Sequence, residues 1–391
     1  MRILHIVGSI SPAAGGPTEA IRMLIEHAPP GYTSEVVTLD NPAEPFLTTF
    51  PFKVTALGGV KKSWYVPALT TWLRANRDRF DGIMLHGLWE YTGVAVLHAI
   101  SGHKPYVVFP HGMLDPYFKK AFPAKHAKKW FFWHLFQNRI LRNATRVLFT
   151  TQIEETLAQQ SFKNWKWNPL VVALGTDPPS TDTNKLLEAF HARWPLLKDK
   201  RFLLFLGRID PKKGPDLLLK AFAAIARHYP DLHLLMAGPV DKAYQQKLEV
   251  DSFDFFAEGR VHWPGMLQGS VKWGALAASE AFILTSHQEN FGIAVVEALA
   301  CGKPVLISNQ INIAPDIESD GCGLVEPDTS EGATRLLHRW LTLTPEQRAA
   351  MSQQALITFA TRYDMRKNAE TILRVFEQVP HTASQSLAEA R

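Results

Sequence analysis

The chain has 391 residues, of which 46% are hydrophobic and 20% are charged, with a net charge of +5 at neutral pH. This length allows two domains of ordinary size, and the composition is that of a globular protein, which excludes a fibrous or low-complexity chain. Two cysteines, Cys301 and Cys322, are too few for a disulfide framework and lack the spacing of metal ligands. We therefore expect a cytoplasmic protein without a secretory signal or a membrane-spanning helix.

Short runs rich in Val, Ile, Leu and Phe alternate with longer helix-like stretches along most of the chain. In the first half the predicted strands are Ile3–Val7, Glu35–Leu39, Gly82–His86, Tyr106–Phe109, Val147–Thr150 and Val171–Leu174. In the second half they are Phe202–Gly207, His233–Ala237, Arg260–Trp263, Ala281–Thr285, Val305–Ser308 and Gly323–Val325. Apolar strands separated by helices are typical of parallel sheets that are covered on both faces.

A polar, proline-containing stretch over residues 175–184 interrupts this pattern and predicts a linker between two domains. We predict an N-terminal α/β domain over residues 1–178, a C-terminal α/β domain over 179–365, and a last segment over 366–391. That segment begins with a helix that packs back across the domains and ends in a polar tail. Ligands of such sheets bind beyond the carboxyl ends of the strands, so the side chains at these ends are the candidate site.

Two motifs of the first half follow predicted strands. Gly15 and Gly16 precede a helix, but they lack the glycine spacing of a dinucleotide-binding loop, so NAD binding is not indicated and a plain flexible turn is the alternative. His111 and Gly112 come directly after the strand Tyr106–Phe109 and Pro110. A lone histidine is usually structural or solvated, yet the position of His111 at a strand end favours a place in a ligand site.

The segment from Lys119 to Arg146 carries eight Lys and Arg residues and no Asp or Glu. Aromatic and apolar side chains recur among them at helical spacing, namely Trp130, Trp133, Phe136 and Ile140, so part of this helix faces a core. The remaining basic face is either simply solvated or docks on an anionic membrane through lysine attraction and aromatic insertion. Nucleic-acid binding is not expected, because no known recognition module surrounds the segment.

The second half opens with a strand that ends at Gly207, followed at once by Arg208 and then by Lys213 and Gly214 in the turn before a helix. Preplaced Arg and Lys side chains stabilise the negative charge that develops on a diphosphate leaving group, most strongly where water is excluded. A basic surface turn is the alternative interpretation.

The strand Ala281–Thr285 leads into a polar loop that contains Glu289, and a helix then opens near Gly292 and carries Glu297. Backbone N–H groups of Phe291, Gly292 and Ile293 at the start of this helix form a ready phosphate or sugar site. One carboxylate is then placed to hold sugar hydroxyls, and the other, about two turns along, to hold ribose hydroxyls.

These motifs resemble those of the retaining GT4 (group 1) glycosyltransferases, a family with the GT-B fold of two Rossmann-like α/β/α domains that face each other across a cleft. The resemblance implies that Glu289, His111, Arg208 and Lys213 serve catalysis. It further implies a nucleotide-sugar site formed by Gly15, Gly16, Arg208, Lys213, Gly265, Leu267, Glu289, Asn290, Phe291, Gly292, Ile293 and Glu297. The chain departs from the family at Leu174, where an asparagine is usual, which puts the interdomain hinge contacts in doubt.

By this resemblance the chain transfers a hexose from a GDP- or UDP-sugar to a saccharide or lipid-linked acceptor in bacterial glycan biosynthesis. Because the sequence contains no Asp-x-Asp motif, we expect no metal or other cofactor. The alternatives are a nucleotide-sugar hydrolase or epimerase of the same fold, and a non-catalytic protein that binds carbohydrate or nucleotide.

Overall fold

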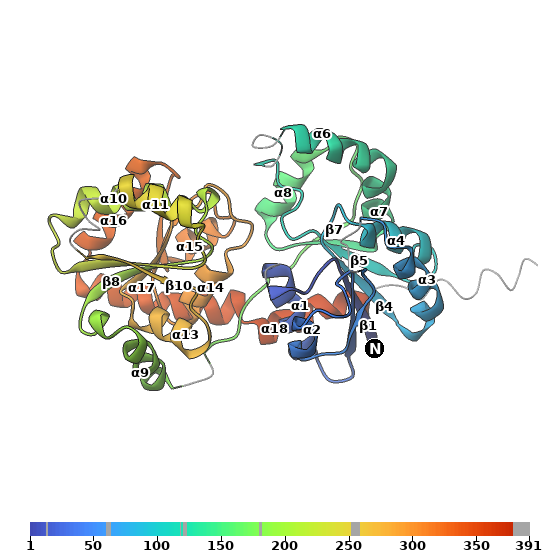
Figure 1. Ribbon diagram of the computed structural model, residues 1–391, viewed down its shortest axis with the longest axis horizontal. Coiled ribbons are helices and arrows are strands. Elements are labelled where there is room, and N and C mark those ends of the chain that lie inside the picture. Colours follow the sequence, from blue (N-terminus) through green and yellow to red (C-terminus); the bar gives the residue numbers. More distant parts are fainter. Residues whose placement is uncertain are drawn as a thin grey trace, which may run out of the picture. The chain divides into compact units, whose positions relative to one another are not determined.

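The computed structural model describes residues 1–12, 15–59, 64–117, 119, 123–179, 182–251 and 259–377. The chain folds into two units (Figure 1). The first unit comprises Met1–Leu174 together with the segment that begins at Met365, and the second comprises Gly175–Asp364. The polar tail expected from residue 381 onward lies outside the described residues.

The described strands of the first unit form a parallel sheet of seven strands in the order β3-β2-β1-β4-β5-β6-β7. They are β1 (Arg2–Val7), β2 (Thr33–Thr38), β3 (Val54–Ala56), β4 (Gly82–His86), β5 (Tyr106–Phe109), β6 (Arg146–Phe149) and β7 (Pro169–Val171). Two expectations need correction. The strand expected at Val171–Leu174 lies earlier, at β7, and the short strand β3 was not expected, because three half-buried residues at a sheet edge carry little periodic signal.

The described strands of the second unit form a parallel sheet of six strands in the order β10-β9-β8-β11-β12-β13. They are β8 (Arg201–Leu206), β9 (Leu232–Ala237), β10 (Val261–Gly265), β11 (Ala281–Leu284), β12 (Val305–Ser308) and β13 (Gly323–Glu326). Every residue of β11 and β12 is buried, as expected of central strands in a sheet that is covered on both faces.

Helices connect the strands in both units. In the first unit they are α1 (Gly16–Glu26), α2 (Phe46–Thr49), α3 (Pro67–Asn76), α4 (Tyr91–Ala99), α6 (Pro123–Phe132), α7 (Asn138–Asn143), α8 (Gln152–Ser161) and α18 (Met365–Leu373). In the second they are α9 (Thr183–Arg193), α10 (Pro215–Ala226), α11 (Lys242–Asp251), α13 (Gly269–Ala278), α14 (Ile293–Ala300), α15 (Ala314–Asp320), α16 (Ser330–Thr342) and α17 (Pro345–Thr358). No helix within the described ranges is long and apolar enough to span a membrane.

The helices lie on both faces of each sheet (Figure 1). In the first unit α3, α4 and α7 cover one face, and α1 packs with α18 on the other. In the second unit α10 packs with α16 on one side, and α9 packs with α13 on the opposite side. Both units are therefore three-layered α/β/α domains of the Rossmann-like type, which confirms the predicted fold class.

The strand order places a topological switch point in each unit. The chain reverses direction across the sheet between the neighbouring strands β1 and β4 in the first unit, and between β8 and β11 in the second. Loops that leave two such strands diverge to opposite sides of the sheet and leave a crevice at the carboxyl ends. These two edges are where ligands of open α/β sheets bind.

The C-terminal segment belongs to the first unit. Phe376 packs against Gly82 at the start of β4, and the Asn368 amide donates a hydrogen bond of 3.1 Å to the carbonyl oxygen of Leu174. On the side of the second unit, Thr176 pairs with Asp364 as an isolated parallel bridge. Because Leu174 contributes its carbonyl oxygen to this contact, the side chain at position 174 is not needed for it.

Candidate active site

The loop after β8 carries the first group of predicted site residues. Asp210 caps the short 3-10 helix Pro211–Lys213 by accepting a hydrogen bond from the Lys212 amide, and Gly214 follows with φ 60°. A Cβ atom at Gly214 would lie 2.2 Å from the carbonyl oxygen of Thr285. Only glycine satisfies both the left-handed backbone and this close approach, so the Lys213–Gly214 pair is set by the packing of the loop.

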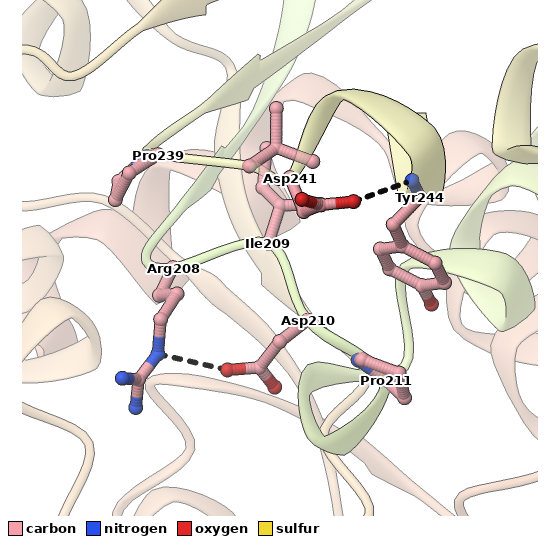
Figure 2. A pocket seen from close by; sticks show the side chains of 8 residues that line it. Arg208, Ile209, Asp210, Pro211, Pro239, Asp241 and Tyr244 are labelled. Carbon is pink, nitrogen blue, oxygen red and sulfur yellow. Dashed lines mark hydrogen bonds and ion pairs between the residues drawn. The ribbon is translucent and has the colours of Figure 1, made fainter. Parts of the chain in front are cut away.

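Arg208 lies at the mouth of this loop and is 71% exposed. Its Nε atom is 2.8 Å from a carboxylate oxygen of Asp210, and Figure 2 shows the two side chains joined beside a pocket of about 290 Å³. The pocket is lined by residues of the loops after β8 and β9 and by Tyr244 of α11. Burial raises the pKa of Tyr244 to about 12, so its hydroxyl stays protonated at neutral pH.

The loop after β11 is bonded to the loop after β8. The Thr285 hydroxyl donates to the carbonyl oxygen of Gly214 at 2.7 Å, and the His287 amide donates to the carbonyl oxygen of Lys212 at 2.8 Å. These strands are neighbours at the topological switch point. Their two loops therefore form one connected structure at the carboxyl edge of the sheet.

Lys213 and Glu289 meet within this structure. The Lys213 ammonium forms an ion pair with the Glu289 carboxylate, and both side chains are 17% exposed. Burial lowers the pKa of Lys213 to about 8, and the neighbouring cations Lys212 and Arg208 act in the same direction. The Asp210 carboxylate opposes this effect, because a nearby negative charge favours the ammonium form.

The backbone of Glu289 is held independently of its side chain. The Glu289 amide donates to the carbonyl oxygen of Gln310 at 3.0 Å, and the Glu289 carbonyl accepts from the Asn312 amide at 3.1 Å. Asn312 also donates from its side chain to the Asn290 side-chain oxygen at 3.5 Å. The loop after β12 thus fixes the position from which the Glu289 carboxylate reaches Lys213.

Helix α14 begins just after this loop. Its N-cap residue, Gly292, has φ 81°, and Phe291 before it is buried with its ring edge-on to Tyr363 at 5.8 Å between ring centres. Ile293 is the first residue of the helix. The amides of the first helical turn lack intrahelical partners, so the N-terminus of α14 offers N–H donors beside Glu289 as well as the positive end of the helix dipole.

Glu297 lies one turn further along α14 and is nearly buried. Its carboxylate accepts a hydrogen bond from the Lys272 ammonium of α13 at 2.6 Å, and the same ammonium lies 4.8 Å from the ring centre of Trp273. The second glutamate of the predicted pair is therefore matched to its own cation, just as Glu289 is matched to Lys213. Each predicted glutamate thus forms an ion pair with a lysine of its own.

Gly265 ends β10 and Leu267 follows it, at the carboxyl edge of the second sheet. The Gly238 amide, after β9, donates to the carbonyl oxygen of Gly265 at 2.8 Å, and Leu267 is buried. Met266 between them is exposed. The structure thus places Gly265 and Leu267 at the carboxyl edge, but neither lines the pocket that contains Arg208.

The remaining predicted residues belong to the first unit. Gly15 and Gly16 open α1 after β1, and His111 follows β5, so they also lie at a carboxyl edge. His111 has φ 51°, a strained backbone for a residue other than glycine.

Glu154 holds the His111 loop and was not predicted. One oxygen of its buried carboxylate accepts from the Gly112 amide at 2.7 Å, and the other accepts from the amide and the hydroxyl of Thr150, both at 2.6 Å. A Glu three residues after Thr151 at the start of a helix is the sequence signal of a cap. That signal places Glu154 at the start of α8 but does not indicate its contact with Gly112.

Two further unpredicted residues, His5 and His86, extend inward from His111. His86 is the last residue of β4 and His5 lies on β1, and both are fully buried. His86 carries a weak signal in the sequence, because it ends an apolar strand, whereas His5 within the apolar strand β1 carries none.

The basic aromatic segment presents an exposed apolar surface. Trp133 and Ile140 are buried and Phe136 packs against the core, as expected, whereas Trp130 is exposed. The register shifts because Trp133–Gln137 forms a turn of π-helix between α6 and α7. We define the aromatic patch as the exposed residues Trp64, Tyr65, Trp130, Phe131 and Leu135. Lys120 and the side chain of Lys125 lie outside the described residues.

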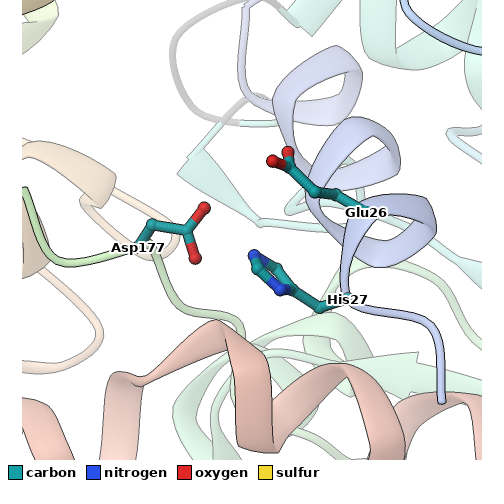
Figure 3. Close-up of side chains that lie close together, drawn as sticks. All are labelled: Glu26, His27 and Asp177. Carbon is teal, nitrogen blue, oxygen red and sulfur yellow. The ribbon is translucent and has the colours of Figure 1, made fainter. Parts of the chain in front are cut away.

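Glu26 and His27 at the end of α1 are drawn in Figure 3 with Asp177. Asp177 belongs to the second unit and the other two residues to the first. No metal site is assigned to a group that is divided between the units.

Two family models match the chain. A glycosyl transferase 4-like domain matches residues 15–175, and the glycosyl transferases group 1 model matches residues 188–357. Together these matches cover most of the described parts of both units, and the second contains every predicted site residue from Arg208 to Glu297.

Individual relatives support the same family. The chain is 27% identical over 262 residues to a D-inositol 3-phosphate glycosyltransferase of Saccharomonospora viridis, which covers 62% of this chain and 57% of the relative. It is 29% identical over 219 residues to a phosphatidyl-myo-inositol mannosyltransferase of Mycolicibacterium smegmatis, which covers 53% of each. The chain thus matches somewhat over half the length of these curated relatives.

A solved structure shares the fold of this chain. The crystal structure of Anabaena HepE in complex with UDP and glucose matches with a TM-score of 0.77 at 18% identity, covering 97% of this chain and 100% of that one. Since both halves of the chain match models of one family and the two sheets reproduce its fold, we conclude that the chain belongs to the group 1 glycosyltransferases of the GT4 type, with the GT-B fold.

Proposed function

We propose that this chain is a retaining glycosyltransferase that needs no metal ion and transfers a hexose from a GDP- or UDP-sugar to a saccharide or lipid-linked acceptor in bacterial glycan biosynthesis. The observation that carries the proposal is the meeting of Lys213 and Glu289 at the switch point of the second sheet. A cation for phosphate and an acid for sugar hydroxyls are thereby held by three interlocked loops.

Charge stabilisation is the main task of this site. As the bond between sugar and diphosphate breaks, negative charge develops on the leaving phosphate oxygens. Arg208, the Lys213 ammonium and the N-terminus of α14 are placed around one sheet edge to stabilise it. With three such groups from the protein and no Asp-x-Asp motif in the sequence, we infer that no divalent ion is required.

Glu289 is proposed to orient the donor sugar and Glu297 to hold the ribose. Bound phosphate competes with Glu289 for the Lys213 ammonium, which frees the Glu289 carboxylate to accept hydrogen bonds from sugar hydroxyls. Glu297 stays nearly buried and paired with Lys272, a suitable rigid acceptor for a pair of hydroxyls. The pocket beside Arg208 then extends the donor site, with Gly265 and Leu267 near the base.

Retention of configuration is inferred from the resemblance to the retaining members of the family. Attack of the acceptor from the front face, with the leaving phosphate accepting the acceptor's proton, needs no protein general base. His111 is proposed to contact the donor sugar, and Gly15 and Gly16 to lie near its phosphates.

The acceptor and the location are proposed from the relatives and from the aromatic patch. The two relatives named above act, by name, on D-inositol 3-phosphate and on phosphatidyl-myo-inositol, and HepE was solved with UDP and glucose. Exposed aromatic side chains, together with exposed Lys128, Arg139 and Arg142 of the same basic segment, suit an anionic inner membrane leaflet. We infer a cytoplasmic enzyme that binds peripherally to such a surface.

The testing experiment is a thermal-shift screen with UDP, GDP, ADP and their sugars in EDTA, followed by turnover with the donor that stabilises the protein. A ligand at a hundred times its Kd adds about 2.7 kcal/mol of stability. We expect one nucleotide to stabilise the protein in EDTA. This stabilisation should be lost in Lys213→Ala and kept in the matched surface variant Lys220→Ala. No stabilisation by any nucleotide would contradict the donor site and favour a non-catalytic role.

Turnover separates the enzymatic alternatives. Glu289→Gln is expected to lower kcat by about 100-fold with a smaller change in donor Kd, because the sugar contact matters most in the transition state. Unchanged turnover in this variant would exclude the proposed role of Glu289. Release of free sugar without transfer, across a broad acceptor panel, would indicate a hydrolase instead.

A further inference from the structure

Three histidines of the first unit form one continuous hydrogen-bonded chain. His5 Nδ1 is 3.0 Å from His86 Nε2, and His86 Nδ1 is 3.0 Å from His111 Nε2. His5 lies on β1, His86 ends β4 and His111 follows β5, and these three strands are consecutive neighbours in the sheet. The chain of imidazoles therefore runs from the centre of the sheet to its carboxyl edge.

The rings meet edge to edge. In both pairs the ring centres are 5.3 Å apart and the ring planes differ by 23° and 15°. Since the bonded nitrogens are only 3.0 Å apart, each hydrogen bond lies near the plane of both rings. This is the favourable direction for a nitrogen lone pair and an N–H group.

Such a chain couples the tautomers of its members. A neutral imidazole has one N–H and one acceptor nitrogen, and His86 uses both nitrogens in the chain. If His5 donates, then His86 must donate to His111 Nε2, and the proton of His111 is on Nδ1. If His111 donates instead, the order reverses and the proton of His5 is on Nε2. Only these two arrangements keep both hydrogen bonds.

The surroundings of His5, at the buried end of the histidine chain, distinguish the two tautomer arrangements. His5 Nε2 is buried and has no hydrogen-bond partner among the described residues. The reversed arrangement would leave an N–H group there without an acceptor, whereas the first leaves only an unused lone pair. Because an orphaned buried N–H is the rarer and costlier of the two, the protons lie on the Nδ1 atoms.

We propose that His5 and His86 are positioning residues that hold His111 in its Nδ1–H tautomer and so present a hydrogen-bond donor, not an acceptor, at the carboxyl edge of the sheet. The proposed recipient is an oxygen of the bound sugar donor, and this part rests on the proposed function. The two positioning residues contact no ligand themselves.

The chain of three histidines is not a path for protons. It ends at the buried His5, so among the described residues it connects His111 to no second exit. Burial lowers the pKa of both His5 and His111 to about 3, which agrees with three neutral rings at physiological pH. His111 accordingly serves as a neutral donor and not as a general base.

The first test needs no substrate and reads the tautomers of the wild-type protein. Selective ¹⁵N-histidine labelling with long-range proton–nitrogen spectra reports which nitrogen of each ring is protonated. We expect Nδ1–H for His5, His86 and His111 from pH 6 to 8, with assignment by single substitutions. An Nε2–H or a mixed tautomer at His111, or a charged ring in this range, would overturn the proposal whether or not the protein proves to be a transferase.

The second test uses His5→Leu, which removes the donor at the buried end, and His5→Asn, whose amide N–H takes the place of Nδ1–H. His5→Leu is expected to give a mixed tautomer at His111 and to lower kcat about tenfold with donor KM within twofold. His5→Asn is expected to restore both.

The matched control is His233→Leu, because His233 forms a similar 3.0 Å contact with His262 near the starts of β9 and β10. It should leave His111 and turnover unchanged. If His5→Leu folds and leaves the His111 tautomer unchanged, the coupling is refuted. If it does not fold, the wild-type spectra alone decide.

Discussion

At the scale of single residues, the charge of Lys213 depends on its surroundings. Burial and the neighbouring Lys212 and Arg208 lower the pKa of Lys213 to about 8. The Lys213 side chain is therefore mostly a charged ammonium at pH 7, and it loses its proton as the pH rises through about 8. Donor capture by the free enzyme should weaken in the same range, since a neutral amine cannot neutralise phosphate.

We accordingly predict an alkaline limb near pH 8 in the profile of kcat/KM, which reports the free enzyme. Lys213→Arg should remove this limb, because an arginine stays charged throughout. Lys213→Ala should lower kcat/KM by roughly 100-fold or more. Lys212→Ala is a control for the direction of the effect. Loss of this neighbouring cation raises the pKa of Lys213, so the limb should move to higher pH. A profile that is flat to pH 9.5 in the wild type would contradict this account.

At the scale of elements, the π-helical turn Trp133–Gln137 decides what the basic segment presents. It keeps Trp133 in the core while Trp130 and Phe131 of α6 remain exposed, at 56% and 63%. Trp64 joins them through an edge contact with Phe132 at 5.7 Å between ring centres. The aromatic patch therefore combines two segments that are distant in the sequence.

Flotation with liposomes tests the patch. We predict that the protein floats with vesicles that contain anionic lipid, and that salt weakens the association because lysine attraction is electrostatic. Trp130→Ser with Phe131→Ser should lower the bound fraction at least fivefold. Leu196→Ser with Val250→Ser, which alters equally exposed apolar side chains of the second unit, should not. Equal flotation with purely neutral vesicles, or none at all, would disprove the membrane role.

At the scale of the whole molecule, buried neutral histidines make folding sensitive to acid. Burial lowers the pKa of His5 to about 3 and that of His86 well below its usual value. Below pH 6.5 the unfolded chain binds protons at these rings and the folded chain does not. Stability is therefore full above about pH 7 and is lost as the pH falls.

Each buried neutral ring lowers the free energy of unfolding by about 1.4 kcal/mol for every pH unit below the pKa of that histidine in the unfolded chain. We predict that the free energy of unfolding falls by about 3 kcal/mol between pH 7.5 and 5.5 on account of His5 and His86, as measured by urea titration. His5→Leu should show a shallower pH dependence than the wild type. The exposed His228 provides the control, since His228→Leu should leave the slope unchanged. Equal stability at both pH values would contradict neutral burial.

The sequence alone determined the architecture and the loops of the site. Strand periodicity located both sheets, and Arg208, Lys213 and Glu289 were recognisable because each follows a strand in a turn or before a helix, which are local properties of the chain. The family resemblance then supplied their roles.

Only the tertiary structure decided which of these residues meet. Lys213 and Glu289 are 76 residues apart, and they pair because β8 and β11 are neighbours in the sheet. His5, His86, His111 and the Glu154 clamp are joined in the same way across separate strands and helices. Strand order arises from packing between distant segments and leaves no mark in any local pattern, so these partners became visible only in the folded chain.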